Sequence, residues 1–168
     1  MTKIGLLSDT HGYIDQTMLK SLSDCDEIWH AGDWGVDVAE QLMATRKPIR
    51  GVYGNIDGRS IRNQFMEISH FEIEQLRVYM IHIGGYPPKY VPGIREQLIS
   101  NQIGLFICGH SHILKIMPDK SIPNLLHINP GAAGKSGFHV MRTMVKFNIA
   151  EGRVWTPEVV ELGYRNKI

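Results

Sequence analysis

The sequence KIGLLSDTH, residues 3–11, decides the kind of fold that we expect. The apolar run from Lys3 to Ser8 is typical of a buried β-strand, and Asp9-Thr10-His11 follows where that strand ends. Side chains two positions apart in an extended segment lie on the same side, so Asp9 and His11 can bind one ion together. We therefore expect a strand that carries a pair of metal ligands at its carboxyl end.

Short apolar strands that alternate with helical patterns continue along the first two-thirds of the chain, which is typical of βαβ units. We expect strands over residues 3–8, 27–31, 49–53, 65–74 and 76–82, and helices over 14–22, 36–45 and 94–101. The last third reads mostly as strands, at 104–108, 113–117, 125–129, 142–149 and 153–162, with a hairpin turn at 148–152. The pattern predicts an α/β fold in one domain, residues 1–168.

Further ligand-type residues stand at the ends of the later strands. They are Asp33 in Gly32-Asp33, Asn55 in Gly54-Asn55, His82, and His110 and His112 in Gly109-His110-Ser111-His112. The carboxyl edge of an α/β sheet is a crevice where loops from separate strands converge, so these side chains can share one site. Carboxylate, amide and imidazole ligands together suit Mn, Fe, Ni or Zn better than Ca.

A two-metal centre is the arrangement that these ligands favour. A carboxylate, best supplied by Asp33, can bridge two ions about 3.5–4 Å apart, the separation used for in-line phosphoryl displacement. The residues therefore predict hydrolysis of a phosphate ester by a water activated between the two ions.

Composition narrows the other possibilities. Of 168 residues, 43% are hydrophobic and 21% are charged, and 18 basic against 17 acidic side chains give a net charge of +1. That balance is ordinary for a globular protein and does not favour polymeric nucleic acid or a membrane surface as a partner. The apolar stretch near the N-terminus is too short for a signal peptide, and two cysteines without a CxxC pattern favour reduced thiols, so a cytoplasmic location is the expectation.

The ordered motifs resemble those of the calcineurin-like metallophosphoesterases, in particular the small phosphodiesterases of bacteria and archaea. The resemblance covers nearly the whole chain and rests on the five ligand motifs, with Asn129-Pro130-Gly131 similar to a family turn near the site. It implies a four-layer αββα sandwich of two mixed β-sheets flanked by helices. It also implies a first metal on Asp9, His11 and His112, a second on Asn55, His82 and His110, and Asp33 as the bridge.

Two departures from the family pattern matter for the chemistry. Many members follow Gly-Asn with a histidine that protonates the leaving group, whereas this chain has Ile56. The small phosphodiesterases commonly lack that histidine too. Ile83 follows His82 where the family usually has glycine, and the proline-rich segment 84–93 after it is expected to overhang the metals. Within that segment Tyr86, Lys89 and Tyr90 are either substrate contacts or part of a rigid surface loop.

The resulting hypothesis is a dinuclear-metal phosphoesterase, more specifically a phosphodiesterase, with Mn expected and Ni, Fe or Zn as alternatives. Asp33, Asn55, His82 and His110 are the expected catalytic residues, a small phosphate ester is the expected substrate, and a homo-oligomer is compatible with the resemblance. The alternatives are a phosphomonoesterase, a scaffold of the same fold like the retromer subunit, and a module that binds nucleotides without turnover.

Several further residues keep two interpretations. His30 is either a strand histidine or a contact of a ligand. Asp57 either orients a ligand such as His112 or a neighbouring backbone, or belongs to a turn with Gly58. His70, His127 and His139 have no partner pattern, so structural or surface roles are expected.

Overall fold

The first of two five-stranded sheets contains the N-terminal strand. The computed structural model describes residues 1–166. The strands are β1 (Thr2–Leu7), β2 (Glu27–His30), β3 (Ile49–Gly51), β11 (Met141–Ala150) and β12 (Arg153–Tyr164), in the order β12-β11-β1-β2-β3. β1, β2 and β3 are parallel, and β11 and β12 join them in antiparallel pairing. The carboxyl ends of the three parallel strands therefore meet at one edge.

The second sheet is mixed in the same way. It consists of β4 (Ile68–Ile73), β5 (Leu76–Ile81), β8 (Leu105–Ile107), β9 (Lys115–Pro118) and β10 (Leu126–Asn129), in the order β4-β5-β8-β10-β9. β5, β8 and β10 are parallel, and the two edge strands are antiparallel to their neighbours.

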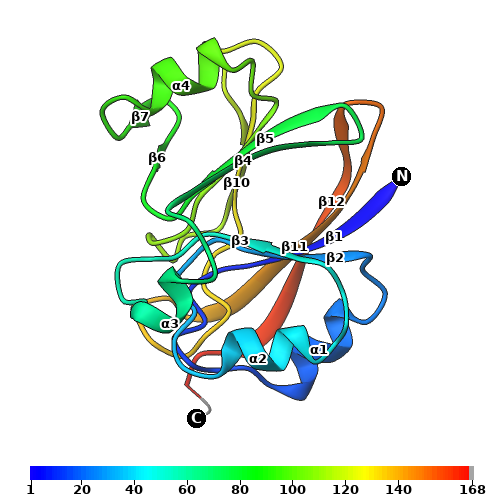
Figure 1. Ribbon diagram of the computed structural model, residues 1–168, viewed down its shortest axis with the longest axis vertical. Helices are drawn as coiled ribbons and strands as arrows, with labels where there is room; N and C mark the ends of the chain where they lie inside the picture. Colours follow the sequence, from blue (N-terminus) through cyan, green and yellow to red (C-terminus); the bar gives the residue numbers. More distant parts are fainter. Residues whose placement is uncertain (167–168) are drawn as a thin grey trace.

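Helices cover the outer face of each sheet (Figure 1). They are α1 (Gln16–Leu22), α2 (Val38–Met43) and α3 (Arg59–Arg62) on the first sheet and α4 (Ile94–Ser100) on the second. The alternation of side chains along β1 explains this layering: Ile4 and Leu6 point into the core between the sheets, whereas Leu7 packs with Met18 and Leu22 of α1. The prediction of a four-layer αββα sandwich of two mixed sheets is confirmed.

All the strands and helices predicted from apolar periodicity are present, with shorter bounds for most of them. Periodicity missed two elements, the four-residue helix α3 and a small hairpin formed by β6 (Gly85–Tyr86) and β7 (Lys89–Tyr90). Both are too short to produce a periodic pattern.

The position expected for the segment 84–93 was wrong. Tyr90 of the hairpin packs against Phe106, and its hydroxyl donates a hydrogen bond to Asp119. Ile94 and Leu98 of α4 lie in the same apolar cluster, so the hairpin lies beside α4 on the outer side of the second sheet (Figure 1). Tyr90 holds the hairpin in this outer layer beside α4, so the hairpin does not overhang the candidate metal ligands.

Within residues 1–166, no helix combines the length and the apolar character that crossing a bilayer requires. The single domain over residues 1–168 and the cytoplasmic location stay predictions.

The buried imidazole of His127 makes the folding stability depend on pH. Its Nδ1 lies 3.2 Å from the Phe106 carbonyl oxygen, and burial lowers its pKa to about 4. Because an unfolded histidine binds a proton below about pH 6.5, the unfolded state gains protons that the folded state does not, and stability falls as the pH decreases from about 6.5 towards 4. We expect this residue to remove roughly 2 kcal/mol of the free energy of unfolding between pH 7.5 and pH 5.

Urea denaturation of chelator-treated protein at the two pH values measures this loss. His127→Gln is expected to show a smaller loss than the wild type, whereas His70→Gln at an exposed position of β4 is expected to match the wild type. Equal pH dependence in His127→Gln and the wild type would contradict the prediction.

Candidate metal centre

The candidate ligands come from loops at the carboxyl ends of strands in both sheets. Asp9 and His11 follow β1, and Asp33 follows β2. Backbone hydrogen bonds fasten these two loops together, from the Asp9 N–H to the Gly32 carbonyl at 3.0 Å and from the His11 N–H to the Asp33 carbonyl at 3.1 Å. The sheet edges thus bring residues that are distant in sequence into one site.

The remaining ligands lie on loops after β3, β5 and β8. Asn55 follows β3, His82 directly follows β5, and the segment with His110 and His112 follows β8. A hydrogen bond of 3.0 Å from the Gly109 N–H to the His82 carbonyl joins the last two loops.

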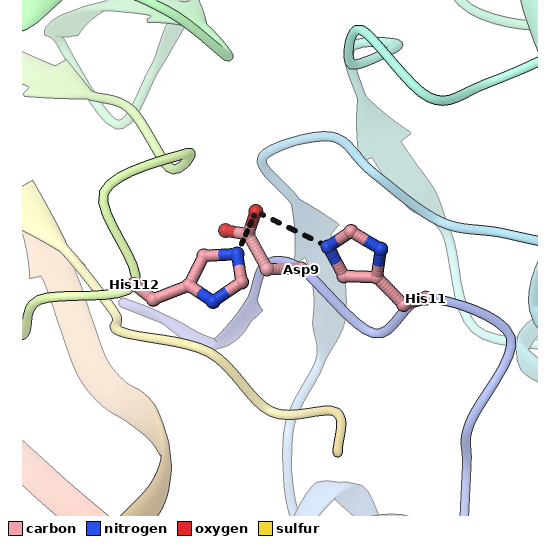
Figure 2. A group of neighbouring side chains, drawn as sticks. All are labelled: Asp9, His11 and His112. Carbon is pink, nitrogen blue, oxygen red and sulfur yellow. Dashed lines mark ion pairs between the residues drawn. The ribbon is translucent and has the colours of Figure 1, made fainter. Parts of the chain in front are cut away.

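The first group of ligands is formed by Asp9, His11 and His112. Figure 2 shows the two imidazoles on either side of the Asp9 carboxylate. Asp9 Oδ1 lies 3.1 Å from His112 Nε2 and 3.9 Å from His11 Nε2. One ligand atom from each residue lies within 4.8 Å of the others, so a single ion can contact all three.

The second group is formed by Asp33, His82 and His110, with Asn55 between the two imidazoles. The same 4.8 Å limit holds for one ligand atom of each of Asp33, His82 and His110. Asn55 Oδ1 lies 3.1 Å from His82 Nε2 and 3.1 Å from His110 Nδ1. The amide oxygen therefore faces the same space as the two nitrogen atoms.

Asp33 lies between the two groups. Its Oδ2 is 3.5 Å from His11 Nε2, a member of the first group, and 3.3 Å from His82 Nε2, a member of the second. Its other oxygen, Oδ1, accepts a hydrogen bond of 3.0 Å from the Ile56 N–H. This bond orients the carboxylate so that one oxygen is directed to both groups.

Electrostatics keeps both carboxylates ionised. Burial raises the pKa of Asp9, but the imidazoles of His112 and His82 and the Ser8 hydroxyl outweigh it, and the net pKa is lowered. For Asp33, burial is likewise outweighed by the hydrogen bond and charge of His82. Burial lowers the pKa of His82, but the carboxylates of Asp33 and Asp9 reverse that effect and raise it. Both aspartates are thus in the anionic form that a cation requires.

Unsatisfied polar atoms at the centre fit a cation. Asp9 Oδ1 and His11 Nε2 are buried, and neither has a hydrogen-bond partner within residues 1–166. A buried polar atom without a partner is unfavourable unless something absent from the chain itself satisfies it. Two carboxylates, one amide oxygen and four imidazoles form a donor set suited to first-row divalent metals.

Neighbouring groups orient the ligands. Asp9 Oδ2 accepts hydrogen bonds from the Ser8 hydroxyl at 2.6 Å and from the His110 N–H at 3.1 Å. The Ala31 carbonyl lies 2.7 Å from His82 Nδ1, which leaves Nε2 of that ring for a metal. The sequence gives no sign of the role of Ser8, because a serine before a ligand aspartate is not a distinctive pattern.

Asp57 and His30 lie beside the ligand loops and contact the backbone or a neighbouring ring. Asp57 accepts hydrogen bonds from the Gly54 N–H at 2.8 Å and the Gly35 N–H at 3.0 Å, so it holds the loop that carries Asn55. His30 is buried, stacks on Trp34 at 3.9 Å between ring centres, and burial lowers its pKa to about 3. Asp57 therefore orients the neighbouring backbone instead of forming a turn with Gly58, and His30 is a neutral strand histidine.

Sequence reasoning did not connect His139 with the site. Its ring packs edge-on against His112 with 5.3 Å between ring centres, and one of its nitrogens lies 2.9 Å from the Gly134 carbonyl. Gly137 allows this approach, because a Cβ there would overlap the His112 ring. No spacing or motif around His139 indicates the contact.

Left-handed backbone is concentrated at the ligands. Asp9, His11, Asp33, His110 and His112 have φ values of 53°, 47°, 57°, 68° and 57°. Residues other than glycine rarely adopt this region, and such residues cluster at functional sites. The site is thus held in a conformation that the surrounding fold imposes.

A two-sheet αββα sandwich with carboxylate, amide and imidazole side chains gathered at its strand ends defines a class of phosphoesterases. The calcineurin-like phosphoesterase superfamily domain matches residues 2–152. The chain belongs to this phosphoesterase superfamily.

Two curated relatives agree with this family. A protein of Mycoplasma pneumoniae described as a probable metallophosphoesterase is 28% identical over 161 residues, which cover 92% of this chain and 94% of that protein. A protein of Methanothermobacter thermautotrophicus with the same description is 30% identical over 135 residues, 77% of this chain and 76% of that protein.

Solved structures share the fold. A structure described as a novel archaeal phosphodiesterase has a TM-score of 0.73 at 20% identity, covering 94% of this chain and 99% of that one. Vps29 of Entamoeba histolytica complexed with zinc has a TM-score of 0.72 at 16% identity, covering 96% and 99%. At these identities the likeness concerns the fold alone.

Proposed function

We propose that this protein is a phosphodiesterase that depends on two divalent metal ions, with Asp33 as the bridging ligand. The position of Asp33 Oδ2, within 3.5 Å of one imidazole from each ligand group, is the observation that supports this most directly. Catalysis by a metal pair needs a shared anionic ligand of this kind.

Each ion has a proposed set of ligands. Asp9, His11 and His112 hold the first, and Asn55, His82 and His110 hold the second. Manganese is proposed as the metal, with Ni, Fe or Zn as alternatives, because this donor set accepts several first-row ions and availability selects among them.

The ions would supply an activated water as the nucleophile and polarise the phosphoryl oxygens for in-line displacement. The chain's own part is to position the reacting groups. Asp33 would hold the site anionic and compact, while His82, His110 and Asn55 would stabilise charge on the phosphoryl oxygens.

Ile56 favours a diester among phosphate esters. Ile56 is 47% exposed. It directly follows Asn55, at the position where many family members have a histidine that acts as general acid. An aliphatic side chain cannot protonate a leaving group, so no acid is assigned there. This departure is shared with the small phosphodiesterases that the chain resembles, and the similar archaeal structure is described as a phosphodiesterase.

Hydrolysis of bis-p-nitrophenyl phosphate and p-nitrophenyl phosphate by chelator-stripped protein tests the proposal. We expect turnover to return when Mn, Ni, Zn or Mg is added, and to be faster for the diester than for the monoester. The metal-free protein is expected to be inactive with both substrates.

Other outcomes would replace the proposal. Preference for the monoester would indicate a phosphomonoesterase, and no turnover with two ions bound would indicate a scaffold or a nucleotide-binding module. Bound metal alone does not separate an enzyme from a scaffold of the same fold. The Entamoeba Vps29 structure, whose fold is similar, is itself described as a zinc complex. Turnover of the diester is therefore the decisive measurement.

A small phosphate ester is the proposed partner. The homo-oligomer stays a prediction, to be measured by light scattering.

A further inference from the structure

A cleft of about 190 Å³ opens beside the second ligand group. Its lining includes Asn55 and His82 together with Tyr53, Arg62, Glu67 and Ile83. The last four residues have no part in the metal centre described above, so the cleft extends the site beyond its ligands.

The Arg62 guanidinium lies over the Tyr53 ring in this cleft. The guanidinium carbon lies 4.2 Å from the centre of the Tyr53 ring. Arg62 Nε donates a hydrogen bond of 2.6 Å to the Asp57 carbonyl, and Nη2 donates one of 3.4 Å to the Gly54 carbonyl. The loop that carries Asn55 therefore fixes the guanidinium in place. Arg62 is exposed, so the group remains accessible to a planar aromatic ligand.

Glu67 adds a hydrogen-bond acceptor. Its Oε2 accepts a hydrogen bond of 3.3 Å from the Tyr53 hydroxyl, which orients the carboxylate. Its other oxygen, Oε1, has no hydrogen-bond partner among residues 1–166, and the residue is exposed. A ligand that carries an N–H donor can therefore bind Oε1 through a charge-assisted hydrogen bond.

Ile83 supplies an apolar surface in the same cleft. Its side chain is 41% exposed although it directly follows the buried ligand His82. The cleft thus combines a guanidinium over an aromatic ring, an apolar side chain and one free carboxylate oxygen. This combination matches a flat, partly apolar group with a polar edge.

We propose that the cleft binds one ester group of the substrate and selects a planar heteroaromatic group with an amino donor, as in adenine, guanine or cytosine. The inference rests on the proposed phosphodiesterase function, because a phosphate at the ligands places its ester groups beside Asn55 and His82. A cleft of about 190 Å³ suits a single such group better than a polymeric strand.

Three chromogenic diesters test the subsite. The p-nitrophenyl ester of adenosine 5′-phosphate has the donor, its N6,N6-dimethyl analogue lacks it, and phenyl p-nitrophenyl phosphate lacks the base. All three release p-nitrophenolate, so the leaving group is constant. We expect kcat/KM of the wild type to be about tenfold higher for the adenosine ester than for the dimethyl analogue, the usual effect of a hydrogen bond to a charged group.

Glu67→Ala is expected to reduce that preference to within twofold. Glu72→Ala is the matched control, because Glu72 is an exposed glutamate of β4 that pairs with Arg77 instead. It is expected to keep the preference of the wild type. A preference that persists in Glu67→Ala, or that is absent from the wild type, would overturn the subsite.

The assay separates failure of the subsite from failure of the function. Metal-restored hydrolysis of the phenyl ester without any preference for the base rejects the subsite alone, whereas no hydrolysis of any diester rejects the phosphodiesterase and the subsite with it.

A binding measurement is independent of turnover. Adenosine 5′-phosphate is expected to shift the amide NMR signals of Tyr53, Arg62 and Ile83, and to shift them less in Glu67→Ala. Equal shifts in both proteins would contradict the role of Glu67.

Discussion

Asp33→Asn is expected to reduce metal-dependent diester hydrolysis by at least about a hundredfold, because it removes the charge shared by both ligand groups. Asparagine tolerates the left-handed backbone that Asp33 adopts at φ 57°, and it retains an oxygen that can accept the hydrogen bond from the Ile56 N–H. The fold is therefore expected to persist while the site fails. Metal analysis of the dialysed protein is expected to find fewer than two ions per chain.

Asp37→Asn is the matched control for this substitution. Asp37 is an exposed aspartate that also has positive φ, at 64°, and its side chain makes no capping hydrogen bond to α2. We expect wild-type metal content and turnover in this variant. Two bound ions and full turnover in Asp33→Asn would contradict the bridging role.

Gly54→Ala is expected to lower the free energy of unfolding by about 2–3 kcal/mol and to abolish activity. A Cβ at position 54 would overlap both the carboxylate and the backbone nitrogen of Asp33. Backbone atoms cannot move aside as the end of a flexible side chain can, so the two loops must separate. Urea denaturation measures the loss of stability, and metal analysis measures the loss of the site.

Gly58→Ala tests whether the effect comes from that contact. Gly58 lies in the same loop, has a φ of −84°, and a Cβ there would have no atom within 4 Å. We expect a change of less than about 1 kcal/mol, since only a weak preference at the start of α3 is affected. Similar destabilisation in the two variants would show that the contact with Asp33 is not the cause.

The layers of this fold were predictable because its strands are marked by apolar runs. In β1 the side chains alternate between the inner core and the helices, and the strand ends where Ser8 and Asp9 begin. The hairpin with Tyr86 and Tyr90 was misplaced because its contact with Phe106 is distant in sequence. Local pattern cannot indicate which face of a sheet a short segment will cover.

The ligand cluster was predictable for a different physical reason. Ligand side chains at strand ends must converge once the strands are parallel, and the seven predicted ligands do lie close together. The residues around them were harder to anticipate. Ser8, His139 and Arg62 reach the site through hydrogen bonds and ring contacts that depend on loop conformation, which carries no periodic signal.

The left-handed backbone at five of the ligands lowers the stability of the folded chain at the same positions that the site needs for activity. Each such residue costs the folded chain about 1 kcal/mol relative to a residue without a Cβ, so glycine at these positions would relax the loops. Directed evolution that selects for heat resistance alone would therefore favour glycine at the positions of Asp9, Asp33 and His112, and so remove the ligands. A useful library for stabilising this enzyme should keep those positions invariant and search the helices and outer strands instead.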